Sequence, residues 1–400
     1  MDPPKFSAVQ EVRIGKESPL WRDERIISIA LQTVSAVVII GVLVWVVTNI
    51  VNAAEQRGLG LGFNFMDSAA GFSISESVIP FSPSDSFARA LLVGVLNTLR
   101  VSLVGIVFAT ILGFIVGIAQ LSTNWLVSRI ALAFVELHRN IPLLVLLFLW
   151  YRGIFTRLPS VRASIQWPGP VFINQRGLYL TWPIFTDTGW IFITLALVGI
   201  VAAALAWILL RRIREVSGRT TNFVGVSLGI FVLGLVLGWV FSGGRPFDTS
   251  IPELQGFNFQ GGIHLTPEFA ALLIGLTTYT AAFIAEVVRG GIQAIQRGQL
   301  EAAAALGLRE SHILNLVVIP QAMRIIIPPL ISQYLNLVKN SSLAVFLGFP
   351  ELFSIGKTVI NQAGRAIPVF ILIMAVYLII SLVTSLLLNI YNRRVQFVER

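Results

Sequence analysis

The sequence predicts an all-α, polytopic membrane protein with about eight transmembrane helices, and two observations carry this prediction. Of the 400 residues, 55% are hydrophobic and only 12% are charged, whereas about a quarter of an ordinary soluble domain is charged. The apolar residues also gather in runs of about 20, the length that a helix needs to cross a bilayer. This composition excludes a disordered chain, a nucleic-acid-binding domain and an ordinary cytosolic enzyme.

The first element is a polar segment over residues 1–25, followed by an apolar run over 26–51. The apolar core of a cleaved signal peptide spans only about 7–15 residues. We therefore expect an extra transmembrane helix that stays in the membrane. Residues 52–87 then form a periplasmic segment rich in Gly, Ser, Pro and aromatic residues.

Further apolar runs predict the remaining spans. The seventh span is the most interrupted, because it contains a Pro-Pro pair and polar residues. The outer segment 156–188 shows little periodicity and could hold loops or amphipathic surface helices. The predicted spans lie at about 92–121, 131–155, 189–210, 222–242, 268–290, 322–347 and 366–391.

Basic residues predict the orientation. If the N-terminus lies inside, Lys and Arg are more frequent in the cytoplasmic loops than in the outer ones, as is typical of membrane proteins. An even number of spans then places both termini in the cytoplasm. The net charge of +9 follows from this distribution, so no nucleic-acid partner is expected.

No catalytic constellation and no metal site are predicted. The chain has no cysteine, and His138, His264 and His312 lie far apart without metal-ligand spacing. Residues 355–358 resemble the end of a phosphate-binding loop, but Glu351 stands where its first glycine belongs, and the topology places this segment outside. We therefore expect no cofactor in this chain.

The most distinctive segment is the loop 289–322 between the sixth and seventh spans. Its Glu301-Ala302-Ala303 sequence belongs to an Ala-rich stretch of strong helix formers, and Gly307 can end that helix. A second apolar segment then reaches Pro320. A small, smooth helix of this kind can bind in a groove of another protein, although a generic surface helix would have the same composition.

This loop resembles the EAA loop of bacterial ABC importer permeases, whose pattern is Glu-Ala-Ala, three residues, Gly, nine residues, Ile-x-Leu-Pro. Val317 and Ile319 replace Ile and Leu conservatively. Segments 96–102 and 135–144 also resemble the first two core spans of the polar amino acid (histidine/glutamine-type) permease family. An extra first span and an insertion over 156–265, with two extra spans, are similar to the general L-amino acid (glutamate/glutamine/aspartate/asparagine) permease subunits.

The resemblance implies a five-helix type I ABC importer core, formed by residues 88–155 and 266–400. It also implies partners: a second, related permease subunit, ABC ATPase subunits that bind ATP and Mg²⁺, and a periplasmic amino-acid-binding protein. The chain would then be the permease subunit of an importer that moves polar L-amino acids across the bacterial inner membrane into the cytoplasm. Ion-coupled secondary transport or a channel is the alternative, although we find no internal repeat of the kind common in secondary transporters.

In this interpretation the EAA loop couples ATP hydrolysis in the partner to movement of the spans. Glu301 would make a charged contact with the ATPase subunit, and Ala302 and Ala303 would permit close approach. Gly307 would make the turn, and Pro320 would close the loop.

Polar side chains at membrane depth mark candidate residues of a substrate path. An amino acid zwitterion needs donors for its carboxylate and acceptors for its ammonium group, and three polar clusters offer both. Interhelical hydrogen bonding is the alternative role for such side chains. The candidates are Asn97, Thr98, Thr278, Tyr279, Lys339, Asn340 and Ser341.

Two pairs of opposite charges have a spacing of three residues, which places both members on one helix face. These pairs are Glu136 with Arg139 and Glu286 with Arg289. We interpret them as candidate structural ion pairs near the inner ends of their spans.

Overall fold

The computed structural model describes residues 24–56, 60–218 and 220–395, so most of the predicted N-terminal segment lies outside the described residues. In the described ranges, seven helices are long and apolar enough to cross a membrane, and one bent pair adds an eighth candidate. The prediction of a helical polytopic protein with about eight spans is confirmed. The unbroken spans are α1 (Glu24–Gln56), α2 (Phe87–Gln120), α5 (Gly189–Ser217), α6 (Phe223–Phe241), α7 (Pro267–Gln293), the run Glu310–Phe346 that contains α10 (Ile319–Asn340), and α12 (Ala366–Val395).

The third predicted span is not one straight helix. It is divided into α3 (Trp125–Asn140) and α4 (Leu143–Phe148), and the two parts of this candidate span meet at an angle of 107°. The cause is Pro142, which lacks an N–H and disfavours helical geometry at the preceding residue. Ile141 accordingly adopts an extended conformation. The expectation of one continuous span over 131–155 is corrected on this point.

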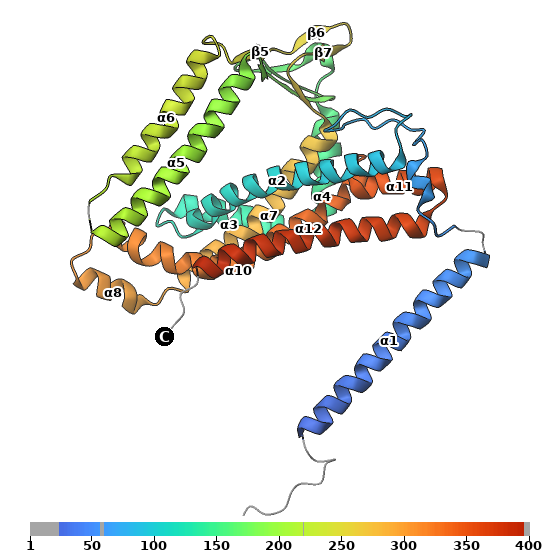
Figure 1. Ribbon diagram of the computed structural model, residues 1–400, viewed down its shortest axis with the longest axis horizontal. Coiled ribbons are helices and arrows are strands. Elements are labelled where there is room, and N and C mark those ends of the chain that lie inside the picture. The colour runs from blue at the N-terminus through green and yellow to red at the C-terminus, as the bar shows by residue number, and fades with distance from the viewer. Residues whose placement is uncertain (1–23, 57–59, 219, 396–400) are drawn as a thin grey trace, which may run out of the picture.

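Helices α2 and α7 form the centre of the bundle and run side by side (Figure 1). Glycine permits this approach, because a Cβ at Gly113 would lie 2.5 Å from Ile284 and one at Gly117 would lie 2.8 Å from Val288. Helix α10 packs on α7, and α12 packs on α10 and α11 (Leu352–Ala363). The main hydrophobic core lies between α2, α4, α7 and α10, and α11 and α12 contribute to a second core with the start of α2.

Helices α5 and α6 form a separate hairpin that rises away from the core in Figure 1. They pack closely on each other, since a Cβ at Gly199 would lie 3.0 Å from the Cα of Gly234. Little of either helix is buried, and their exposed side chains are mostly apolar. Such a surface suits contact with lipid.

Short strands occupy the segments on either side of this hairpin. The strands form a four-stranded antiparallel sheet in the order β1-β2-β3-β8 and the pairs β4–β5 and β6–β7. Each strand has only three or four residues, too few to show the alternation that identifies a strand, so segment 156–188 holds strands where loops or surface helices were expected. The bounds are β1 (Ile165–Trp167), β2 (Val171–Asn174), β3 (Gly177–Leu180), β4 (Trp182–Phe185), β5 (Phe247–Ser250), β6 (Glu253–Gln255), β7 (Asn258–Gln260) and β8 (Ile263–Leu265).

The remaining elements are short helices. They are η2 (Asn64–Asp67), η3 (Leu149–Ile154), η4 (Phe155–Arg157), η5 (Val161–Ala163), α8 (Arg297–Ala305), α9 (Glu310–Ile313), η6 (Leu314–Val318) and η7 (Ser341–Phe346). Helix α8 and the strands lie at opposite ends of the bundle (Figure 1). We call these ends the α8 end and the sheet end.

Candidate functional site

Helix α8 contains the Glu-Ala-Ala sequence and ends where the sequence predicts. The N–H of Gly307 donates to the carbonyl of Ala304 at 2.9 Å, and the N–H of Leu308 donates to that of Ala303 at 3.3 Å. This pair of bonds is a Schellman cap, in which the residue after the helix adopts a left-handed conformation. Gly307 has φ +75°, a conformation that a side chain would strain.

The surface of α8 is small, polar and open. Glu301 and Ala302 are exposed, whereas Ala303 is buried. Among the ion pairs of the described residues none involves Glu301. Leu306, which the sequence analysis missed, is 81% exposed. Its position directly before the capping glycine was the available signal.

Pro320 is the second residue of α10, which continues the helical run of α9 and η6 without a break. It is exposed. The turn after α8 is therefore connected to α10 through α9 and η6, which form one helical run with it.

A polar pocket of about 290 Å³ lies between α7 and α10. It brings together two of the predicted path residues, Tyr279 and Asn340, and adds Gln333 and Asn336. Positions 333, 336 and 340 share one helix face, and this spacing of polar residues in an apolar span is the signal that the sequence analysis overlooked. The full lining is Tyr279, Thr280, Phe283, Gln333, Asn336 and Asn340.

The chemistry of this pocket is uncharged and hydrogen-bonding. Amide side chains both donate and accept, and aromatic faces attract a cation. The pocket can therefore hold a small polar molecule, including one that carries separate positive and negative groups.

The other candidates in the same spans do not line this pocket. The hydroxyl of Thr278 donates to the carbonyl of Ile274 in its own helix at 2.9 Å. Lys339 is exposed in the last turn of α10, where a positive charge interacts favourably with the helix dipole. Ser341 is fully buried and donates to the carbonyl of Val338 at 2.7 Å.

Asn97 and Thr98 lie at the sheet end, away from the polar pocket. The amide of Asn97 donates to the carbonyls of Glu76 and Pro350 at 2.9 and 2.8 Å. The hydroxyl of Thr98 accepts from the N–H of Leu352 at 3.1 Å. Both side chains are fully buried, so they fasten α2 to neighbouring backbone and do not line the pocket.

A carboxylate that the sequence analysis did not single out organises this region. Glu76 Oε1 lies 2.6 Å from Arg100 Nη1, and its Oε2 accepts from the hydroxyl of Thr266 at 2.6 Å. Thr266 caps α7, and Arg100 lies 4.4 Å above the ring of Phe269. The segment before α2 is thereby tied to both central helices.

Glu351 is a second buried carboxylate at the sheet end. It accepts from the N–H groups of Phe353 and Ser354 at 2.8 and 2.7 Å and from the hydroxyl of Tyr377 at 2.9 Å. Glu351 is therefore the N-terminal cap of α11. Burial raises the pKa of Glu351 to about 7, although the three hydrogen bonds act in the opposite direction.

At the α8 end, the two predicted pairs have different outcomes. Arg289 Nη2 lies 2.8 Å from Glu286 Oε2, so this pair forms within α7. Glu136 and Arg139 do not form an ion pair in the described part of the chain, and Glu136 instead accepts from Asn140 at 3.0 Å. Arg139 lies 3.6 Å from Glu286, because the end of α3 packs against α7.

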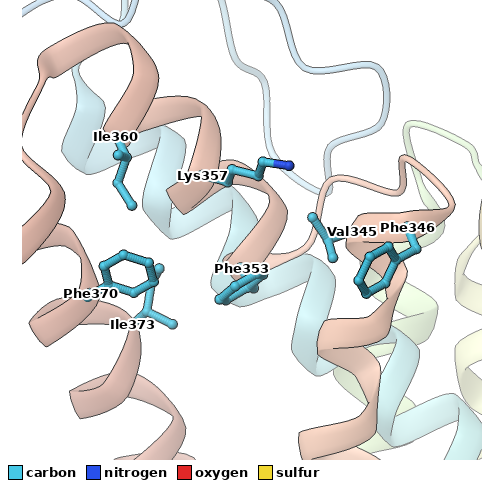
Figure 2. Close-up of a pocket in the computed structure, with 7 residues that line it drawn as sticks. All are labelled: Val345, Phe346, Phe353, Lys357, Ile360, Phe370 and Ile373. Carbon is cyan, nitrogen blue, oxygen red and sulfur yellow. The ribbon is translucent and has the colours of Figure 1, made fainter. Parts of the chain in front are cut away.

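A second pocket, of about 330 Å³, lies between η7, α11 and α12 (Figure 2). Its wall is mainly apolar, and the amino group of Lys357 points away from the rings of Phe353 and Phe370. Such a wall leaves the polar groups of a zwitterion without partners, at a cost in free energy. We therefore take the pocket between α7 and α10 as the candidate binding site.

Within the described residues, no group of three or more His, Asp or Glu side chains is placed to hold a metal ion.

Comparisons with known proteins identify relatives of this chain. The sequence pattern of the family described as "Binding-protein-dependent transport system inner membrane component" matches residues 196–397. The general L-amino acid transport system permease protein AapQ of Rhizobium johnstonii is 44% identical over 379 residues, which cover 94% of each chain. The glutamate/glutamine/aspartate/asparagine transport system permease protein BztB of Rhodobacter capsulatus is 38% identical, over 100% of this chain and 99% of its own.

A more distant relative is the glutamate/aspartate import permease protein GltJ of Escherichia coli. It is 29% identical, and the alignment covers 96% of that protein but only 58% of this chain. The chain described here therefore has segments that GltJ lacks. By its similarity to AapQ and BztB over nearly its whole length, the chain belongs to the inner membrane components of binding-protein-dependent transport systems and, among them, to the amino-acid ABC transporter permeases.

Proposed function

We propose that this chain forms one half of a pathway that imports polar L-amino acids, and that Tyr279, Gln333, Asn336 and Asn340 contact the substrate. The observation that carries the proposal is the polar pocket between α7 and α10, because it gathers partly exposed hydrogen-bonding groups on one side of an otherwise apolar bundle. The names of the relatives support L-amino acids as the substrate class.

The pocket chemistry favours substrates with uncharged polar groups or with one positive and one negative group. Side-chain amides can accept from the ammonium group and donate to the carboxylate of an amino acid. A related second permease subunit would supply the other half of the pathway. A soluble periplasmic binding protein would deliver the substrate at the sheet end.

In this proposal the α8 end lies in the cytoplasm, together with both termini, as the distribution of basic residues favours. ATPase subunits, with ATP and Mg²⁺ bound, would dock on α8. Glu301 offers an unpaired charge, Ala302 is small enough for close approach, and Leu306 offers an exposed apolar contact. Gly307 and Pro320 would set the angle between α8 and α10, so that movement of α8 moves a helix of the pocket.

Reconstitution tests the transport reaction. The complete complex in proteoliposomes, with its binding protein and L-glutamine, should take up substrate only when ATP is present in the compartment that faces α8. Uptake should persist after collapse of the proton gradient. Uptake that follows the proton gradient and ignores ATP would instead identify an ion-coupled transporter, and passive flux without ATP would identify a channel.

Substitutions in the pocket test the binding site. Asn340→Leu should raise the substrate concentration needed for half-maximal uptake about tenfold, since it removes hydrogen bonds to the substrate. Lys339→Met is the matched control, because Lys339 is the neighbouring residue and does not line the pocket. Equal effects of the two substitutions would refute this assignment.

Substitutions in α8 test the coupling. Glu301→Lys and Gly307→Val should abolish uptake while the protein still reaches the membrane and retains the second permease subunit. Glu310→Lys, an exposed charge reversal in the neighbouring α9, should leave most of the uptake intact. Undiminished uptake in both α8 variants would contradict the role of this helix.

A further inference from the structure

Two arginines and a phenylalanine from three separate segments meet on the sheet end. The guanidinium carbon of Arg162 lies 5.3 Å from the centre of the Phe257 ring. Arg176 Nη1 donates to the carbonyl of Phe257 at 3.3 Å. Phe257 is 77% exposed, and both arginines are exposed. We call these three residues the arginine–phenylalanine cluster.

The cluster is held in place by buried hydrogen bonds. The side chain of Asn174 is fully buried, accepts from the N–H of Arg176 at 2.8 Å and donates to the hydroxyl of Ser164 at 2.9 Å. Tyr179, also buried, donates to Asn258, the residue after Phe257, at 2.7 Å. A surface that is ordered before binding loses less entropy when a partner docks.

Arginine is frequent in the segment that supplies two members of the cluster. Residues 152–176 contain four arginines and no Asp or Glu, and no ion pair of the described residues involves any of them. Of the acidic residues in the neighbouring strands, Asp248 belongs to β5, and Glu253 begins β6, the strand that leads into the turn with Phe257. Unpaired guanidinium groups beside an exposed ring favour a partner that presents carboxylates and an apolar contact.

We propose that the arginine–phenylalanine cluster is a docking site for an acidic surface of the soluble amino-acid-binding protein. This inference rests on the proposed function, which places the sheet end outside the cytoplasm. Arginine and aromatic residues are enriched at the centres of protein interfaces. Guanidinium groups also form paired hydrogen bonds with carboxylates.

A protein partner fits the position better than a membrane surface does. Strands β4 and β5 adjoin the spans α5 and α6 directly in sequence, and they carry the exposed Trp182 and Phe185, which suit the membrane interface. The cluster instead lies on the turn between β6 and β7 and on segments that pack with it. Gly256, with φ +66°, makes the turn that presents Phe257.

The cluster is also connected to the transport core. Strand β3, which follows Arg176, pairs with β8, and β8 leads through Thr266 into α7. Helix α7 contributes Tyr279 to the polar pocket. Docking at the cluster would therefore occur on a sheet that is continuous with a helix of the pathway.

The test measures ATPase stimulation of the complete complex in proteoliposomes as a function of the concentration of glutamine-loaded binding protein. Arg162→Glu and Arg176→Glu should each raise the concentration for half-maximal stimulation about tenfold or more, with an unchanged maximum. Phe257→Ser should raise it by a similar factor at any salt concentration. The effect of the arginines should shrink as salt screens the charges.

Arg245→Glu is the matched control, since it makes the same charge change at an exposed residue before β5 and should leave the concentration unchanged. If wild-type protein responds but all cluster variants behave like Arg245→Glu, the docking inference is overturned and the proposed function stands. If no binding protein stimulates the wild type, the proposed function itself fails. An effect that depends on anionic lipid content and not on binding-protein concentration would show that the cluster binds the membrane instead.

Discussion

Polar contacts connect the helices at both ends of the bundle, but the two sets differ in how deeply they are buried and in which elements they join. At the sheet end, Glu76 joins Arg100 of α2 to Thr266 at the start of α7. At the α8 end, Glu286 near the end of α7 joins Arg289 of its own helix and Arg139 of α3. One helix, α7, therefore takes part in both.

The sheet-end cluster is the tighter of the two. The side chain of Glu76 is 11% exposed, and both of its oxygens have a partner at 2.6 Å. At the α8 end, the ion pair between α3 and α7, Arg139 with Glu286, has a distance of 3.6 Å, and the Arg139 side chain is 40% exposed. Buried, fully paired groups are costly to separate, whereas exposed pairs contribute little.

This difference determines how costly it is to separate the polar contacts at each end. Separating α3 from α7 at the α8 end breaks a partly exposed ion pair, and it also exposes Val135 and Ala285, which are buried in one apolar cluster. Separating the segment before α2 from α7 at the sheet end leaves a partly buried guanidinium without its carboxylate. For these polar contacts, the free energy needed to separate the elements is therefore higher at the sheet end.

The largest effect is expected at Glu76. Glu76→Ala should lower the free energy of unfolding by about 2–3 kcal/mol, somewhat less than for a fully buried pair, because Arg100 loses its charge partner. Chemical denaturation of the detergent-solubilised complex measures this change. The double variant Glu76→Ala with Arg100→Met should recover part of the loss, since no unpaired charge remains; a double variant less stable than the sum of both single changes would argue against the ion pair.

A pH dependence is expected from Glu351 at the same end. Burial raises its pKa from 4.5 to about 7, so the folded protein holds this proton more tightly than the unfolded chain. The stability that Glu351 contributes is therefore largest at acidic pH and is lost as the pH rises from 4.5 to about 7.

Between about pH 5 and about pH 7.5 this loss should reach about 2 kcal/mol. The loss is measured as the difference in free energy of unfolding between the wild type and Glu351→Gln, which has no titrating group at this position. This difference should change as the pH rises, with the wild type losing stability. A stability difference between the two proteins that stays constant over this range would show that the carboxylate remains ionised.

Much of the fold follows from the sequence, because a long apolar run indicates a membrane-spanning helix whatever that helix packs against. The end of α8 was predictable for a local reason, since Gly307 adopts a conformation that favours glycine. The bend after Asn140 was also encoded locally, in Pro142, but a hydropathy run does not register it. The three- and four-residue strands left no periodic signal.

The contacts between distant segments were not predictable in the same way. The pairs Glu76–Arg100 and Arg139–Glu286 join separate elements, and no repeating pattern in the sequence indicates that these elements meet. Gln333 and Asn336 were overlooked for a different reason, because each polar residue is unremarkable until the spacing to Asn340 is considered. The sequence therefore indicated which spans contain polar residues, but not which face of each span packs against a neighbouring element.

The smallest effect is expected at the α8 end, and it tests the comparison most directly. Arg139→Gln should change the free energy of unfolding by less than about 1 kcal/mol, because the pair with Glu286 is long and partly exposed. Arg289 remains to neutralise Glu286, so no unpaired carboxylate results. The same denaturation series as for Glu76→Ala measures both. If Arg139→Gln is as destabilising as Glu76→Ala, the polar contacts at the two ends are equally strong, and their difference in burial does not decide their contribution to stability.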